Sequence, residues 1–179
     1  MADPLGKRTC DEAIGVLVGA HRRLRKGLAL ARGMADGRIV RPERVQQIAV
    51  RVGHCFTRFL QLHVRDEEDS VAPRLTGREG EVDGALEAMA NEHREHQRSL
   101  AVVVAACQEI ARVPERLTRL APYLRRALEA VEGAFERHFA REESTVFPAI
   151  RRLLGPSGAA QILDEMRARR RYGPVALGT

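Results

Sequence analysis

Apolar residues recur along this chain at spacings of three and four, which is the pattern of helices that bury one face. The pattern predicts four long helices followed by a shorter fifth. The first helix is predicted to start at a capping box formed by Thr9 and Glu12, and to end near Gly33 and Gly37. Its inward stripe includes one histidine and consists of Ile14, Leu17, His21, Leu24, Leu28 and Ala31.

A second helix is predicted to begin at Pro42, because proline suits the first turn of a helix, and to close at Pro73. His54 falls on the polar side of this helix, so we leave it out of any site. The inward stripe has a histidine and a glutamate near its end and consists of Val45, Ile48, Val52, Phe56, Phe59, His63 and Glu67.

The third helix has two histidines on its inward stripe, and a connection from Pro114 to Pro122 with one helical turn of its own precedes the fourth. A last, shorter helix is expected to start at Ser157 and to end before Gly173 and Pro174. The inward residues are Val82, Leu86, Met89, His93, His96, Leu100, Val103, Cys107 and Ile110 on the third helix, and Leu124, Leu128, Val131, Phe135, His138, Glu142 and Val146 on the fourth.

The four long helices are amphipathic and come as two hairpins with short connections. We therefore expect an all-α fold, an antiparallel up-down four-helix bundle with an additional short C-terminal helix. The 179 residues fit a single domain, with a core over about residues 10–153 and the C-terminal helix and tail over 154–179.

One motif occurs twice in the chain. His63 and Glu67 recur 75 positions later as His138 and Glu142, and both copies reach a proline ten residues after the histidine, in the pattern HxxxEExxxxP. Residues four apart lie on the same face of a helix, so each copy directs an imidazole and a carboxylate to one point. This is the arrangement of a pair of metal ligands.

Burying these polar groups in an apolar seam costs several kcal/mol unless each finds a partner, and a bound cation compensates all of them together. A single histidine on an apolar face is more often a hydrogen-bonded core residue. The doubled motif, with further inward histidines on the first and third helices, outweighs that interpretation.

The kind and number of donors restrict the metal. Six or seven nitrogen and oxygen donors are too many for one tetrahedral zinc ion, and mixed imidazole and carboxylate donors suit iron or manganese. We therefore expect two ions, with Glu67 and Glu142 bridging them and histidines at the ends. Cys10, Cys55 and Cys107 are far apart and have no CxxC spacing, which argues against a thiolate site and a disulfide framework.

Composition adds little further chemistry. The net charge of +6 is concentrated in a C-terminal cluster of arginines, which we interpret as a solvated helix end; a nucleic-acid contact is the less favoured reading. No stretch approaches the ~20 apolar residues of a membrane span, and residues 1–6 lack the apolar core of a secretory signal, so we expect a cytoplasmic protein without a membrane partner. The arginines are Arg167, Arg169, Arg170 and Arg171.

At these residues the chain resembles the hemerythrin-like, or HHE cation-binding, domain family. The resemblance covers roughly residues 10–153 and rests on the histidine of the first helix, the two HxxxE motifs, Glu92-His93 on the third helix and Phe147-Pro148 on the fourth. It implies a non-haem di-iron centre, with room for an oxo or hydroxo bridge. The ligands implied are His21, His63, Glu67, His93, His138 and Glu142, with His96 as the candidate for the fifth histidine.

The chain departs from the oxygen-carrying members of that family. They space the histidines of the third helix four apart, whereas His93 and His96 are three apart. They place an aspartate five positions after the last histidine, whereas this chain has Glu142 at four and Glu143 at five. The chain therefore looks like the broader bacterial branch. We expect Glu68 and Glu143 to be solvated neighbours of the ligands. A ferritin-like site is excluded because no histidine follows a glutamate by three positions.

The resemblance implies binding or sensing of dioxygen or nitric oxide, or the handling of iron. The alternative from the same chemistry is a di-iron redox enzyme with peroxidase-like or iron-sulfur repair activity. A third hypothesis is a metal-free helical interaction module whose basic tail contacts nucleic acid. The residues one turn from the ligands are expected to form a dry wall around the centre, and they are Leu17, Phe59, Met89 and Phe135.

Overall fold

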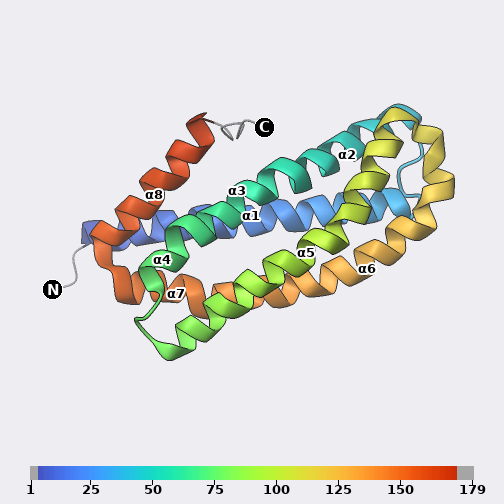
Figure 1. Ribbon diagram of the computed structural model, residues 1–179. Coiled ribbons are helices and arrows are strands. Elements are labelled where there is room, and N and C mark those ends of the chain that lie inside the picture. Colours follow the sequence, from blue (N-terminus) through green and yellow to red (C-terminus); the bar gives the residue numbers. More distant parts are fainter. Residues whose placement is uncertain (1–3, 173–179) are drawn as a thin grey trace, which may run out of the picture. The chain divides into compact units, whose positions relative to one another are not determined.

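The computed structural model describes residues 4–172, and within this range every regular element is a helix. The predicted all-α class is therefore confirmed. The predicted end of the last helix at Gly173 and Pro174 lies outside the described residues. Figure 1 follows the elements from α1 in blue to α8 in red. They are α1 (Pro4–Ala35), α2 (Pro42–His54), η1 (Cys55–Phe59), α3 (Leu60–Arg65), η2 (Asp66–Val71), α4 (Ala72–Leu75), α5 (Gly80–Arg112), η3 (Pro114–Arg116), α6 (Leu117–Arg141), η4 (Glu142–Val146), α7 (Phe147–Ala149), η5 (Ile150–Leu154) and α8 (Gly155–Tyr172).

Three predicted boundaries need correction. Helix α1 begins at Pro4, so Thr9 lies inside it and forms no cap. Helix α6 begins at Leu117, after one short 3-10 turn, and Pro122 therefore lies within this helix. Because proline has no backbone N–H, one hydrogen bond of the helix's second turn is missing. Helix α8 begins at Gly155, where a φ of +64° reverses the chain in a conformation that suits glycine.

The second and fourth helical stretches are not uniform α-helices. Both are interrupted by π-helical segments, which are η1, η2, η4 and η5. Two of these coincide with the repeated motif, because η2 contains Glu67 and η4 begins at Glu142. A π turn inserts an extra residue and re-aims the side chains on either side of it, and such turns are frequent at functional sites.

The motif's prolines account for the position of these π turns. Pro73 and Pro148 lie in the first turns of α4 and α7, directly after η2 and η4. A proline inside a helix donates no hydrogen bond to the carbonyl four residues earlier, and its ring clashes with that carbonyl. The wider π turn removes the clash and lets the helix continue. The repeat is thus present in the backbone as well as in the side chains.

The chain forms two compact units, and α1 and α5 each contribute to both. The first unit comprises residues 1–19, 62–90 and 141–179, and the second comprises 20–61 and 91–140. The core of the first unit is built mainly from Leu17, Val71, Leu75, Val82, Met89, Val146, Phe147, Ile150, Ile162 and Met166.

In the second unit, segments of all four long helical stretches pack against one another. Arg25 of α1 forms an ion pair with Glu136 of α6, with Nε 2.9 Å from a carboxylate oxygen. Gln46 of α2 donates to the carbonyl of Ala111 on α5 at 2.8 Å. The buried apolar residues of this unit include Leu24, Leu28, Met34, Val45, Ile48, Val52, Phe56, Leu100, Val103, Ile110, Leu124, Leu128, Val131, Phe135 and Phe139. Across residues 4–172, no helix has the length and apolar character needed to cross a membrane.

Candidate metal centre

All the predicted ligands are buried. Their exposed fractions are 0% for His21, 1% for His63, 0% for Glu67, 5% for His93, 7% for His96, 3% for His138 and 0% for Glu142. His54, Glu68 and Glu143 are exposed, as their positions in the pattern predicted. The helical period therefore separates the buried ligands from these three exposed residues correctly, although Asp66 in the first copy is also buried.

The first unit brings together His63, Glu67 and Glu142. Each of these residues offers one ligand atom, and the three atoms lie within 4.8 Å of one another. Nε2 of His63 is 3.3 Å from Oε1 of Glu67, one turn further along the same helical stretch. Glu142 comes from the other copy of the motif, at the start of η4. Both motif copies thus supply a donor to one buried group.

Two carboxylates in this group have an electrostatic consequence. Burial raises the pKa of Glu67 well above its usual value, and the charges of Glu142, Asp66 and Glu68 raise it further. Without a cation, Glu67 therefore keeps its proton to a higher pH than an exposed glutamate does. A bound divalent cation would reverse this preference, because its charge stabilises both carboxylates in their ionised form.

The second unit brings together His93 and His138. Their Nε2 atoms are 3.2 Å apart, and their rings meet at an angle of 67°. Nδ1 of His138 donates to a carboxylate oxygen of Glu92 at 2.9 Å, since an ionised carboxylate can only accept. This hydrogen bond fixes the tautomer of His138 and leaves the lone pair of Nε2 available to a metal ion, as in carboxylate–histidine–metal triads.

No role was predicted for Glu92 from the sequence. Its side chain is 22% exposed, so neither burial nor the apolar stripe marks it. The available signal was its place directly before His93 in the Glu-His pair.

His96 lies beside this pair in a different setting. Its ring stacks on Phe135 with centroids 4.7 Å apart, and it is perpendicular to His138 at 5.1 Å. Among the described residues, the groups of donors that lie within 4.8 Å of one another contain His93 and His138 but not His96. The role of His96 as a fifth histidine ligand stays a prediction.

Aromatic rings pack against the histidines of the second unit. His21 stacks on Phe139 with ring centroids 4.1 Å apart, and Phe139 meets Phe135 edge-on at 5.3 Å. Both phenylalanines are fully buried, so they exclude water from these imidazoles. Phe139 was not singled out from the sequence, although it directly follows the motif histidine.

The predicted dry wall needs one correction. Leu17, Met89 and Phe135 are buried as expected. Phe59 is only partly buried, and the guanidinium of Arg23 lies over its ring at 5.1 Å. Phe56 is 3% exposed and contacts Phe135 instead. Both phenylalanines were predicted to face inward, and the wider turn of the π segment η1 accounts for the difference, because it leaves only Phe56 facing the core.

The cysteines take no part in either group. All three are free thiols, and burial raises the pKa of Cys55 to about 11 and that of Cys107 to about 12. These thiols are protonated at neutral pH, whereas a thiolate is the form that binds metal.

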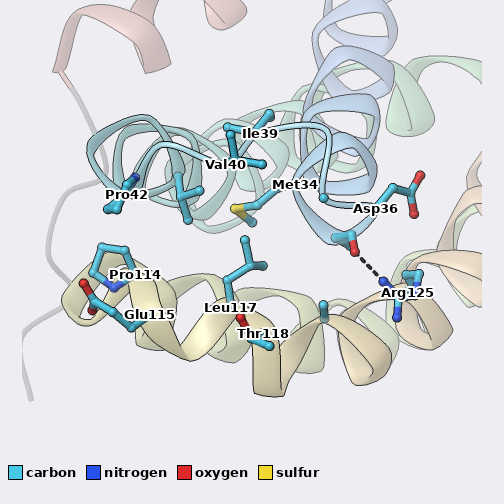
Figure 2. Close-up of a pocket in the computed structure, with 14 residues that line it drawn as sticks. Met34, Asp36, Ile39, Val40, Pro42, Pro114, Glu115, Leu117, Thr118 and Arg125 are labelled. Atoms are coloured by element: carbon cyan, nitrogen blue, oxygen red, sulfur yellow. Dashed lines mark hydrogen bonds between the residues drawn. The ribbon is translucent and has the colours of Figure 1, made fainter.

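A pocket of about 450 Å³ lies elsewhere in the second unit, between the turn after α1 and the start of α6. Figure 2 shows that it is lined mostly by apolar side chains, and that Arg125 is engaged in a hydrogen bond to the carbonyl of Ala35. None of the predicted ligands lines this pocket. It is therefore separate from both groups of donors.

Buried histidines and glutamates lie on the four long helical stretches of this all-α chain. This arrangement is typical of helical proteins that bind metal ions. The sequence model of the hemerythrin HHE cation binding domain matches residues 12–150 of the chain. The chain belongs to this family, and the family together with the buried His/Glu groups indicates a metal-binding protein. The chain has no match among curated proteins and none among solved structures.

Proposed function

We propose that this protein binds two non-haem iron ions and uses them to bind or sense dioxygen or nitric oxide, or to handle iron. The proposed ligands are His21, His63, Glu67, His93, His96, His138 and Glu142. The observation that carries the proposal is the group of His63, Glu67 and Glu142, in which three side chains with at most 1% exposure hold their donor atoms within 4.8 Å of one another.

The donor set suits iron or manganese, and the resemblance to hemerythrin-like domains favours iron. It consists of neutral imidazoles and carboxylates, without a thiolate, and a single zinc ion would use only four of its members. Glu67 and Glu142 are close enough to act on the same ions. Two carboxylates and five histidines together offer more donors than one tetrahedral ion uses, which favours two ions. Membership of a family of cation-binding domains supports a bound metal ion.

The protein's own residues would perform three tasks. Glu67 and Glu142 would bridge the ions, the histidines would fix their ends, and Glu92 would hold His138 in the tautomer that presents Nε2. Phe135 and Phe139 would keep water away from the imidazoles. The bound iron would supply an open coordination position for a diatomic ligand.

We further propose that residues 1–179 form one hemerythrin-like domain with its core over about 10–153. Support comes from α1 and α5, which run without a break through residues of both units, and from a family match that extends over residues 12–150. A cytoplasmic location stays a prediction from the sequence.

Exposure of the iron-loaded, reduced protein to oxygen tests the ligand-binding proposal. Reversible binding predicts an optical change that appears with oxygen, reverses when the gas is removed, and consumes no reductant over repeated cycles. Nitric oxide is tested in the same way in the absence of oxygen. Continuous consumption of reductant would instead identify a redox enzyme, and an unchanged spectrum with both gases would leave iron handling as the function.

A further inference from the structure

The C-terminal helix α8 lies beyond the residues that the family model matches. It belongs to the first unit and packs closely against the other elements of that unit. Residues of its apolar face, among them Ala159, Ile162 and Met166, are buried in that unit's core. Helix α8 also contacts η2, the π segment that contains Glu67. An element outside the family's common region therefore touches the backbone that carries a proposed ligand.

The contact is made through a fully buried carboxylate. Asp66, the residue before Glu67, has an exposed fraction of 0%. Nη1 of Arg169 donates to its Oδ1 at 2.8 Å, and Nη2 of Arg170 donates to its Oδ2 at 2.5 Å. Two arginines thus neutralise one buried aspartate. This corrects the expectation of a solvated side chain for Arg169, which is only 12% exposed, whereas Arg167, Arg170 and Arg171 are exposed as expected.

A second set of bonds ties the other end of η2 to α8. Ser70 donates to Glu165 with the oxygens 2.5 Å apart, and Arg169 donates to the Ser70 hydroxyl. Nη2 of Arg74 donates to Glu165 at 2.7 Å, while its Nη1 donates to the carbonyl of Ser70 at 2.8 Å. Both ends of the π segment are therefore fixed by one helix.

The other copy of the motif has a different residue at each of these positions. The residues 75 positions after Asp66 and Ser70 are Arg141 and Thr145, so the aspartate and the serine belong to the first copy alone. Two arginines placed on one buried carboxylate next to a ligand are a specific arrangement. We name Asp66, Arg169 and Arg170 the Asp66 clamp.

We propose that Arg169 and Arg170 are positioning residues of the metal centre: by holding Asp66 they fix η2 and thereby set the direction of Glu67. This inference rests on the proposed function. Partners of this kind, which orient a ligand without touching the metal, typically change metal affinity by 10- to 100-fold when removed. The contact between α8 and η2 would then affect the metal affinity of the site.

The test compares D66N and R169Q/R170Q with the control R151Q in the full chain. Arg151 of η5 forms an exposed ion pair with Asp11 of α1 in the same unit, so its replacement breaks an arginine–carboxylate contact away from the ligands. Ferrous iron is added without oxygen and competed with a coloured chelator. We expect D66N and R169Q/R170Q to bind it 10- to 100-fold more weakly with an altered spectrum, and R151Q to stay within about twofold of wild type.

Hydrogen exchange of the metal-free proteins gives a second readout. Amides of residues 62–71 should exchange faster in D66N than in R151Q, because only the former loses the clamp. If R169Q/R170Q does not fold, because it leaves the Asp66 carboxylate buried without a counter-charge, two variants cover that case. D66N/R169Q/R170Q removes the carboxylate charge as well, and R169K/R170K keeps the positive charges but binds Asp66 with weaker geometry.

Wild-type affinity and spectrum in the folded clamp variants would overturn the inference and leave the proposed function intact. Failure of the wild-type protein to take up iron would overturn the proposed function and the inference with it.

Discussion

His93 and His138 lie 45 positions apart in the sequence, and their Nε2 atoms face each other at 3.2 Å inside a buried group. Two imidazoles rarely converge in this way without a shared proton or a shared cation. The Glu92 carboxylate holds the other nitrogen of His138, so the facing lone pair is the one available to a metal ion. His93 and His138 are two of the proposed ligands that the second unit supplies.

Replacing Glu92 with glutamine should weaken iron binding about 10-fold, because the amide holds the His138 tautomer less firmly than a carboxylate does. Chelator competition with ferrous iron measures the change. The matched control is E95Q, three residues along the same helix at an exposed position, which should bind iron like the wild type. Equal loss in both variants would refute the orienting role.

The pKa of Glu67 predicts a pH-dependent penalty in the metal-free protein. Its folded pKa is raised above the usual 4.5 by burial first and by neighbouring carboxylates second. A raised carboxyl pKa leaves stability unaffected at low pH and lowers it as pH rises above the usual value. E67Q lacks this penalty, so the difference in unfolding free energy between E67Q and wild type should grow from pH 4.5 to neutrality. Denaturant titrations at several pH values measure it, and parallel pH curves would contradict it.

Phe139 should be far more important to stability than Phe59. F139A removes a fully buried ring that stacks on His21 and should cost about 3–5 kcal/mol of unfolding free energy. F59A removes a partly exposed ring and should cost clearly less. Chemical denaturation of both variants tests the corrected wall, and equal losses would argue against it.

The motif's prolines should matter through the π turns that precede them. P148A restores the missing N–H, which favours a regular α-helix over η4 and turns Glu142 away from its present direction. Iron affinity should fall while the melting temperature stays close to that of wild type or rises. The control is P122A in α6, where no π turn adjoins the proline and iron affinity should not change. Unchanged affinity in P148A would show that the π turn is independent of the proline.

The sequence predicted the buried ligands because a spacing of four has one meaning on a helix. His63 with Glu67, and His138 with Glu142, had to share a face wherever the helices packed. The inward stripes predicted the four long helices and the exposed position of His54 for the same reason. A periodic pattern contains this information independently of tertiary contacts.

Other features depended on tertiary contacts or on the backbone. A π turn leaves no clear mark in a helical pattern, so the partial exposure of Phe59 could not be anticipated. The C-terminal arginines look solvated in the sequence, because their partner Asp66 lies about one hundred positions away. Thr9 and Glu12 match a capping box, but the helix already begins at Pro4, so both residues lie inside it.

The most direct test of the central claim is the iron content of the full chain purified from iron-supplied cells, measured by elemental analysis for wild type, H63A and H54A. His63 is a buried proposed ligand, whereas His54 is an exposed histidine on the same helical stretch. The account predicts two iron ions per chain in wild type and H54A, and a clear loss in H63A. Absence of iron from the wild type, or equal iron content in all three proteins, would contradict it.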